Sequence, residues 1–382
     1  MAPKTLGDIS AFITKGATPT TYGYKWQSFG VPFLRSECVS SRGLDMRQSM
    51  FISESADHAL RRSRVKDGDI LMTITGNVGR VVRLSGVGSA NINQHIARVR
   101  IRDSAFDPGF IYHFLSQSEM REYFESIVTG QAYPQISLTQ VRATTVPEVS
   151  IVEQKAIAAA LDSADALIAL LERLIAKKHA IRQGMRQELL AGKARLYGFT
   201  GPRLDYSLGE IARVKTGARN NQDKVAAGEY PFFVRSATVE RIDSYSHDCE
   251  AILVPGEGGI GSIFHYIHGK FEVHQRVYMI SGFATTVSGR YVYHFMRQYF
   301  GTHAMENSVK ATVDSLRLPT FKNFPLQLPP LDEQEAIARV LDDAGREIEL
   351  LVQRLAKARR VKQGMMQQLL TGRVRLPAEA AT

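Results

Sequence analysis

Residues Glu153–Leu196 read EQKAIAAALDSADALIALLERLIAKKHAIRQGMRQELLAGKARL, and a second copy follows 180 residues later at Glu333–Leu376, EQEAIARVLDDAGREIELLVQRLAKARRVKQGMMQQLLTGRVRL. The two copies align without a gap and are identical at 22 of 44 positions. Solenoid repeats have much shorter periods, of about 20 to 50 residues. The repeat therefore indicates that one half of the chain has been duplicated.

Each copy carries apolar residues at alternating spacings of four and three, which is typical of a helix that packs on another helix. These residues are Ile157, Leu161, Ala164, Ile168, Leu171 and Ile175 in the first copy, and Ile337, Leu341, Ala344, Ile348, Leu351 and Leu355 in the second. A single stripe of this kind also fits an amphipathic helix lying on its own domain. Two matching stripes can pair with each other, and a helix of roughly 38 residues is about 57 Å long at about 1.5 Å per residue, so it would act as a spacer.

Outside the repeat, both halves read mainly as short strands and turns. Ile70–Ile74 and Arg80–Val82 flank a Gly/Asn turn and predict a hairpin, and Ile92–Ile101 alternates like a strand. Phe110–Ser126 reads as a helix. Gly192 and Gly372 follow the last apolar residues of the two copies, where a glycine would end each long helix.

The second half repeats this order of segments with lower identity. Leu208–Ile211 corresponds to Leu6–Ile9, and Tyr230–Ser236 corresponds to Val31–Ser36, while most of the extra residues of the first half lie between Ser36 and Ile70. We predict an α+β fold with an internal pseudo-two-fold duplication. It has mainly-β domains at residues 1–150 and 201–330, a first long helical segment at 151–200, and a second one with a C-terminal tail at 331–382.

The composition is that of a globular protein with an excess of basic residues. Lys and Arg exceed Asp and Glu by 48 to 38, which gives a net charge of +10 and suits a polyanionic partner such as nucleic acid. No signal peptide or long apolar run is present, so a cytoplasmic location is expected. Cys38 and Cys249 are the only cysteines, which argues against a disulfide framework or a zinc site.

Motifs for catalysis are weak. Gly256–Gly261 fits GxGxxG, but the strand-like segment Ser262–Ile267 follows it instead of a helix, so a hairpin turn is the better interpretation. There is no phosphate-binding GxxxxGK[ST] loop and no Asn/Asp-Pro-Pro-aromatic motif of amino-methyltransferases. We interpret His113 and His294 as packed side chains, and Glu153 and Glu333 as residues favoured at helix starts. We therefore expect no catalytic residue, metal site or cofactor in this chain.

Polar and basic residues at turns, with aromatic residues nearby, are the better functional candidates. Arg and Lys suit guanine edges and phosphates, and Asn and Gln suit adenine edges, so this set fits DNA reading in the major groove. The candidates are Lys15, Thr18, Tyr22, Lys25, Trp26, Arg35, Asn77, Arg80, Asn93, Gln94, Gln131 and Tyr133 in the first half, and Lys215, Arg219, Asn220, Gln222, Arg235, Gln275, Arg276 and Lys310 in the second. Basic clusters on the helices could contact DNA, contact a partner or remain solvated; they are Lys177, Lys178, His179 and Arg182, with Lys357, Arg359, Arg360 and Lys362.

The chain resembles the specificity subunits of type I restriction-modification systems over essentially its whole length. The resemblance rests on the paired Pro-x-x-x-x-x-Glu-Gln-x-x-Ile-Ala-x-x-Leu-Asp segments at 147–162 and 329–342, the second of which has Pro-Pro-Leu-Asp-Glu-Gln spacing. The Gln-Gly-Met endings at 183–192 and 363–372 and the domain openings at Leu6 and Leu208 add to it. Val149–Val152 departs from the more usual Pro-Pro-Leu-Asp at 329–332.

The resemblance implies two target recognition domains, each reading one half of a bipartite DNA site, and two helices packed as an antiparallel coiled coil that sets the spacer. Half-sites about 34 to 36 Å apart would suit two such readers. The expected partners are two modification (M) subunits, which use S-adenosylmethionine to methylate adenine N6, and restriction (R) subunits, which use ATP and Mg²⁺. The specificity subunit itself would not be catalytic. Two alternatives remain open: a tandem DNA-binding protein outside restriction, and a methyltransferase or nuclease with an irregular site.

Overall fold

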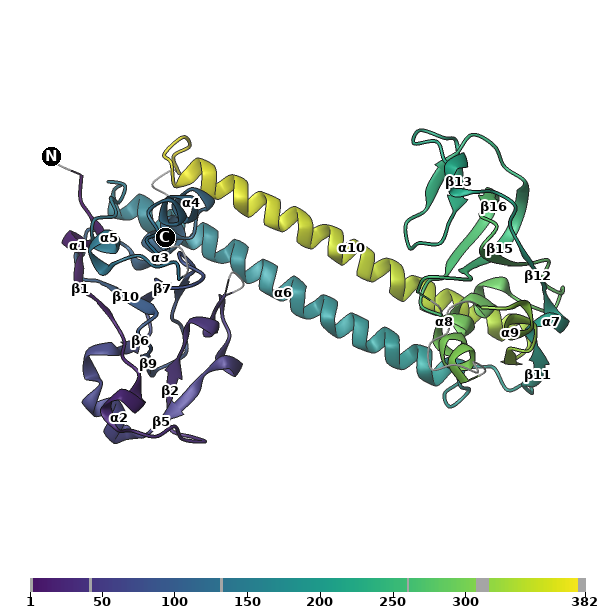
Figure 1. Cartoon of the computed structure of the whole chain (residues 1–382), viewed down its shortest axis with the longest axis horizontal. Helices are drawn as coiled ribbons and strands as arrows, with labels where there is room; N and C mark the ends of the chain where they lie inside the picture. The colour runs from purple at the N-terminus through teal and green to yellow at the C-terminus, as the bar shows by residue number, and fades with distance from the viewer. Residues whose placement is uncertain (1–2, 41–42, 131–132, 260, 307–315, 377–382) are drawn as a thin grey trace. The chain divides into compact units, whose positions relative to one another are not determined.

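The computed structural model describes residues 3–40, 43–130, 133–259, 261–306 and 316–376. The chain divides into two compact units, of which the first comprises Met1–Glu172 with Arg354–Thr382 and the second comprises Arg173–Gln353. Both long helices therefore contribute to both units. The architecture confirms the predicted α+β class and the internal duplication (Figure 1).

The first unit contains two four-stranded sheets, ordered β1-β10-β7-β8 and β5-β2-β9-β6, and the short pair β3-β4. The strands are β1 Ser10–Lys15, β2 Val31–Leu34, β3 Val39–Ser40, β4 Gly43–Leu44, β5 Met50–Ile52, β6 Arg64–Lys66, β7 Ile70–Thr73, β8 Val81–Arg83, β9 Ser89–Ile92 and β10 Ile96–Ile101. The antiparallel pair β7-β8 confirms the predicted hairpin. The strand predicted over 92–101 is wrong in one respect, because a turn at Asn93–His95 separates β9 from β10.

The helices of the first unit are short, apart from the two that it shares with the second unit. They are α1 Leu6–Ile9, α2 Glu54–Ala59, α3 Pro108–Leu115, α4 Ser118–Ser126 and α5 Leu138–Arg142, with 3-10 turns η1 Pro19–Tyr22, η2 Ser36–Cys38, η3 Met46–Gln48 and η4 Arg61–Ser63. The single helix predicted over Phe110–Ser126 is therefore wrong: the backbone becomes extended at Gln117 (φ −65°, ψ 153°), and two helices form. The elements β3, β4 and α2 account for the extra residues between Ser36 and Ile70.

The second unit joins the equivalent strands into one six-stranded sheet, ordered β12-β17-β15-β16-β13-β14, beside the pair β11-β18. The strands are β11 Leu204–Ser207, β12 Arg213–Thr216, β13 Tyr230–Phe233, β14 Glu240–Ile242, β15 His247–Pro255, β16 His265–Val273, β17 Val277–Ser281 and β18 Pro325–Leu328. The helices are α7 Leu208–Ile211, α8 Gly289–Glu306 and α9 Leu318–Lys322, with the 3-10 turn η5 Asn221–Asp223. Because β15 and β16 pair antiparallel, the GxGxxG segment belongs to a hairpin connection, as expected.

The long helices α6, Ile151–Leu190, and α10, Leu331–Leu369, lie against each other in an antiparallel sense within each unit (Figure 1). In the first unit Lys362 Nζ lies 2.6 Å from Asp165 Oδ1, and Arg359 pairs with Glu172. In the second unit Lys178 Nζ lies 2.8 Å from Glu347 Oε2. Both helices end just before glycines with left-handed backbone, Gly192 (φ 70°) and Gly372 (φ 71°), because glycine adopts this conformation without a steric cost.

The core of each unit combines one β domain with the start of one long helix and the end of the other. In the first unit, Ile157 and Leu161 of α6 and Leu369 of α10 share a buried cluster with Phe110. In the second unit the arrangement is reciprocal: Ile337 and Leu341 of α10 and Leu189 and Leu190 of α6 join a cluster around Phe300. The helical repeat thus supplies core residues to both β domains.

The other large apolar residues of the predicted helix stripes are buried or half-buried. Leu171 and Ile348 are buried, whereas Ile168, Ile175, Leu351 and Leu355 are half-buried. The same face continues past Ile175 through Lys178 and Arg182, which are also half-buried. The four-and-three spacing therefore follows the exposure pattern along α6.

Candidate nucleic-acid interface

In both units, a glycine that follows strand β1 or β12 lies against the end of a strand with which that strand is not paired, β9 or β16. A Cβ at Gly16 would lie 1.7 Å from the Ile92 carbonyl oxygen, and a Cβ at Gly217 would lie 2.0 Å from that of Val273. No other residue fits at such a distance. The crossing brings the loop that follows each glycine against the turns 93–95 and 274–276, which hold many of the predicted DNA-binding residues.

The first unit gathers a hydroxyl, an amide, an imidazole and a phenol at this crossing. Thr18 Oγ1 donates to Gln94 Oε1 over 2.6 Å, and Gln94 Nε2 lies 3.2 Å from His95 Nε2. The ring of Tyr133, which is 59% exposed, meets the His95 ring edge-on with centroids 6.1 Å apart. Asn93 is buried and its Oδ1 accepts from the His95 amide, so it shapes the turn and offers little surface to DNA.

The second unit gathers a more strongly charged set at the equivalent place. Gln275 Nε2 donates to Asn220 Oδ1 over 2.6 Å. Arg219 pairs with Glu272, whose carboxylate is almost fully buried, at 3.3 Å. Arg235 and Arg276 pair with the same carboxylate, that of Glu257, at 3.1 and 3.2 Å.

The other predicted residues are distributed less evenly. Lys15, Tyr22, Lys25, Asn77, Lys215 and Gln222 are exposed, and Arg35 and Arg80 are half-buried. Trp26 packs on Phe33 with ring centroids 5.2 Å apart, so it belongs to a small core cluster. Gln131 and Lys310 lie outside the described residues. His95, Glu257 and Glu272 were missed, although each lies next to, or pairs with, a predicted residue.

The repeated Glu-Gln at each long-helix start joins the helix to its β domain. Gln154 accepts from the Asp107 amide at 2.9 Å and donates to the carbonyls of Ala105 and Val149. Gln334 makes the same three bonds, to Ser288, Thr286 and Pro329. Both glutamines are buried, so the motif is conserved between the two copies for a structural reason.

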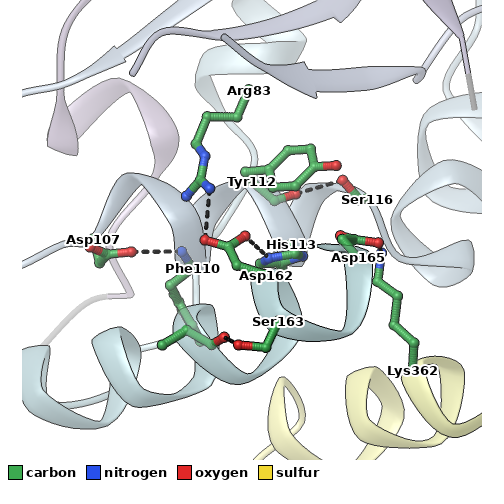
Figure 2. Close-up of polar contacts among 11 residues, drawn as sticks. Arg83, Asp107, Phe110, Tyr112, His113, Ser116, Asp162, Ser163, Asp165 and Lys362 are labelled. Atoms are coloured by element: carbon green, nitrogen blue, oxygen red, sulfur yellow. Dashed lines mark hydrogen bonds and ion pairs between the residues drawn. The ribbon is translucent and has the colours of Figure 1, made fainter. Parts of the chain in front are cut away.

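The repeated aspartate, about two helical turns further on, binds a histidine of the β domain. Asp162 accepts from Arg83 at 2.7 Å and contacts His113 Nε2 at 2.8 Å (Figure 2). His113 is fully buried, and its Nδ1 has no hydrogen-bond partner in the described part of the chain. Burial lowers the pKa of His113 and outweighs the opposing effect of Asp162. The neutral ring, donating from Nε2, therefore fits this site.

The second unit repeats this contact between an aspartate of the long helix and a buried histidine. His294 Nε2 lies 2.9 Å from Asp342, which also pairs with Arg290, and burial again lowers the pKa of the histidine. These contacts confirm that His113 and His294 are packed side chains. Each repeated glutamate also pairs with the repeated arginine of the other copy, Glu153 with Arg375 and Glu333 with Arg195.

The described residues contain neither a membrane-spanning helix nor a metal-binding cluster. No helix there is long and apolar enough to cross a membrane. No group of three or more His, Cys, Asp or Glu in the same residues is placed to hold a metal ion.

Comparison with known proteins gives a consistent result. The family profile described as type I restriction modification DNA specificity domain matches residues 1–177 and again 205–360. The EcoDI specificity subunit of a type I restriction enzyme from Escherichia coli is 29% identical over 164 residues, which is 43% of this chain and 36% of that protein. A putative type I restriction enzyme MjaX specificity subunit from Methanocaldococcus jannaschii is 22% identical over 407 residues, covering 97% of this chain and 93% of the relative.

Among solved structures, the S subunit of a type I restriction-modification system from M. genitalium has the same fold. Its TM-score is 0.69 at 14% identity, with 96% of this chain and 95% of that chain covered. The sequence matches to the E. coli EcoDI and EcoBI subunits are shorter and span only 36% and 34% of those proteins.

Proposed function

Because this chain belongs to the family of type I restriction modification DNA specificity domains, we propose that it is the DNA-reading, non-catalytic subunit of a type I restriction-modification enzyme. Each β domain reads one half of a bipartite site in double-stranded DNA. The long helices set the spacer between the half-sites and dock the modification subunits.

One observation carries the proposal: the two units present different side chains at equivalent loop crossings. At both crossings the glycine lies against the carbonyl oxygens of two consecutive residues, 92–93 or 273–274. Both crossings carry a glutamine, Gln94 or Gln275. The first adds Thr18 and Tyr133, whereas the second adds arginines and carboxylates. A shared frame with unlike polar loops is what two readers of different base sequences require, because base edges are distinguished by donor and acceptor pattern.

The partner part of the proposal is supported by duplicated apolar positions on the outer faces of the helices. In the first unit Leu170 and Val361 are 54% and 51% exposed, and in the second unit Ile181 and Leu350 are 45% and 65% exposed. Leu170 corresponds to Leu350 in the repeat, and Ile181 corresponds to Val361. Exposed apolar side chains on a long helix suit a helical partner. Equal positions in both copies suit two copies of one modification subunit, with restriction subunits joining the same complex.

The cofactors belong to those partners in this proposal. S-adenosylmethionine would be held by the modification subunits, and ATP and Mg²⁺ by the restriction subunits. The purified chain alone should neither bind S-adenosylmethionine nor methylate DNA, whereas its complex with modification subunits should do both. Methylation by the chain alone would replace the proposal with an enzymatic function.

Spacer control is tested by inserting four residues after Ala176 of α6, about one helical turn. Methylome sequencing of cells that carry the intact system should show both half-sites unchanged and the spacer between them changed. A matched control inserts four residues after Gly198, beyond the end of α6, where the helix length is unaffected. Altered half-site bases after the Ala176 insertion would contradict the spacer role.

A further inference from the structure

Three loops of the second unit meet at a single carboxylate. Arg235 follows β13, Glu257 lies in the connection between β15 and β16, and Arg276 lies between β16 and β17. Glu257 Oε2 is 3.1 Å from Arg235 Nη1, and Oε1 is 3.2 Å from Arg276 Nη1. The Glu257 side chain is 31% exposed, and the Arg235 and Arg276 side chains are 49% and 61% exposed. Glu257 therefore holds the guanidinium groups of Arg235 and Arg276 beside each other, and we call these three residues the triad.

Stability is a weak explanation for this triad. Exposed ion pairs contribute little to stability, and here one carboxylate serves two arginines that repel each other. The backbone beneath is nevertheless fixed, because the Arg276 amide donates to His274 Nδ1 over 2.9 Å. His274 is buried, and its pKa is lowered by burial and by the two arginines, which keeps Nδ1 available as an acceptor. A rigid support below exposed charges is typical of a recognition site.

The chemistry of the triad suits a particular kind of base pair. Each guanidinium has five N–H donors, and only one nitrogen of each is used by Glu257. The remaining donors can bind guanine O6 and N7 as a fork, and a glutamate can accept from cytosine N4. Glu257 also compensates one of the two positive charges, which limits the attraction of this loop cluster to phosphates in any sequence.

The first unit has no equivalent among its described residues. Because Leu34 pairs with Ile92 as Phe233 pairs with Val273, Ser36 is the counterpart of Arg235, and His95 stands where the second unit has Arg276. The neighbouring Arg35 donates to the Gln48 carbonyl at 3.2 Å. At the position of Glu257, two residues after the equivalent Thr73 and Pro255, the first unit carries Thr75 in place of a carboxylate. The difference is therefore specific to one reader.

We propose that Arg235 and Arg276 read guanines of G·C pairs in the half-site of the second unit, with Glu257 as the residue that positions both guanidiniums. This inference rests on the proposed DNA-reading function and deepens it. It predicts which half of the site depends on the triad and which bases within that half are affected.

The test uses the complete chain with its modification subunits in a host whose methylome is sequenced. Arg235→Lys and Arg276→Lys keep the charge but lose the fork, so each should relax one guanine position of a single half-site by roughly 5- to 150-fold. Glu257→Gln should relax the same positions and steepen the dependence of in vitro DNA affinity on salt, by about one unit of log–log slope, because a guanidinium becomes free for phosphate. Gln94→Ala, in the first unit, should alter only the other half-site.

Glu240→Gln is the matched control. Glu240 belongs to an exposed pair with Lys224 in the same unit, with side chains 33% and 47% exposed, and should leave both half-sites unchanged. The triad proposal is overturned if the lysine variants weaken binding equally at all sequences, or if they and Gln94→Ala alter the same half-site. Absence of any bipartite methylated motif in the wild-type system is a different result, since it would overturn the DNA-reading function itself.

Discussion

Replacing Glu333 with glutamine should destabilise the second unit, while the equivalent change at Glu153 should have little effect on the first. The two glutamates occupy the same position of the helical repeat, and both pair with the repeated arginine of the other copy. Their surroundings differ. The Glu333 side chain is fully buried and also lies 3.5 Å from Arg203, which is 10% exposed. The Glu153 side chain is 12% exposed and has a single partner, Arg375, which is 73% exposed.

The expected difference follows from what each variant leaves behind. Breaking a buried ion pair costs about 3 to 5 kcal/mol when the remaining charge is uncompensated. Arg203 retains bonds to the Leu189 and Leu190 carbonyls at 2.9 and 3.0 Å, so we expect about 2 to 3 kcal/mol for Glu333→Gln. In the pair of Glu153 with Arg375 the arginine is largely exposed to solvent, as in a surface ion pair. Loss of this pair should therefore cost at most about 1 kcal/mol.

The assay is thermal unfolding of the purified chain, with hydrogen exchange to assign the loss to a unit. At about 2 to 4 °C per kcal/mol for units of this size, Glu333→Gln should lower the melting temperature of the second unit by roughly 4 to 12 °C. Faster exchange should appear in peptides covering the start of α10 and the end of α6. Equal losses in both variants, to within about 0.5 kcal/mol, would refute the reasoning.

Further predictions concern the packed histidines, the repeated glutamines and the crossing glycines. Because burial lowers the folded-state pKa of His113 and His294, protonation favours the unfolded chain, so stability should be full above about pH 6.5 and should fall as the pH drops below it. In urea unfolding at several pH values, the double variant His113→Gln, His294→Gln should show a shallower decline, and an unchanged slope would contradict this. Gln154→Ala or Gln334→Ala should lower the free energy of unfolding by about 2 to 4 kcal/mol in thermal unfolding, since each leaves buried backbone groups unpaired. A decrease below about 0.5 kcal/mol would contradict the proposed role of these glutamines in joining each helix to its β domain. Gly16→Ala should destabilise the first unit by at least about 2 kcal/mol, because its Cβ would overlap the Ile92 carbonyl, whereas Gly184→Ala, in a helix with nothing within 4 Å, should stabilise by up to about 1 kcal/mol. Circular dichroism melts of both glycine variants would show whether the opposite signs hold.

The helical repeat was predictable because its physical causes lie in local sequence. Leu161 and Leu341 recur at seam spacing, and Gly192 and Gly372 lie where a helix must stop. The break in the predicted helix at Gln117 was not predictable, because its apolar pattern runs on into α4, where Phe124 is fully buried. The turn at Asn93–His95 was likewise hidden within an alternating pattern, since Ile92 and Ile96 are buried on either side of it.

The candidate interface was predictable by residue type and only partly by position. Thr18 and Gln94, which are far apart in sequence, were both selected, but their contact depends on the close approach at Gly16. Trp26 was selected as an aromatic near basic residues, yet it packs on Phe33. Glu257 was overlooked because phosphates repel a carboxylate, and its two arginine partners lie far from it in the sequence.

The reciprocal construction of the cores also bears on how the chain matures during synthesis. Leu369 and Leu370, almost the last described residues, are buried in the core of the first unit. On the ribosome, the N-terminal domain must wait for the whole of Arg173–Gln353 to emerge, roughly 10 to 40 s at about 5 to 20 residues per second. A premature stop just before Gln368 would therefore damage the domain that is translated first.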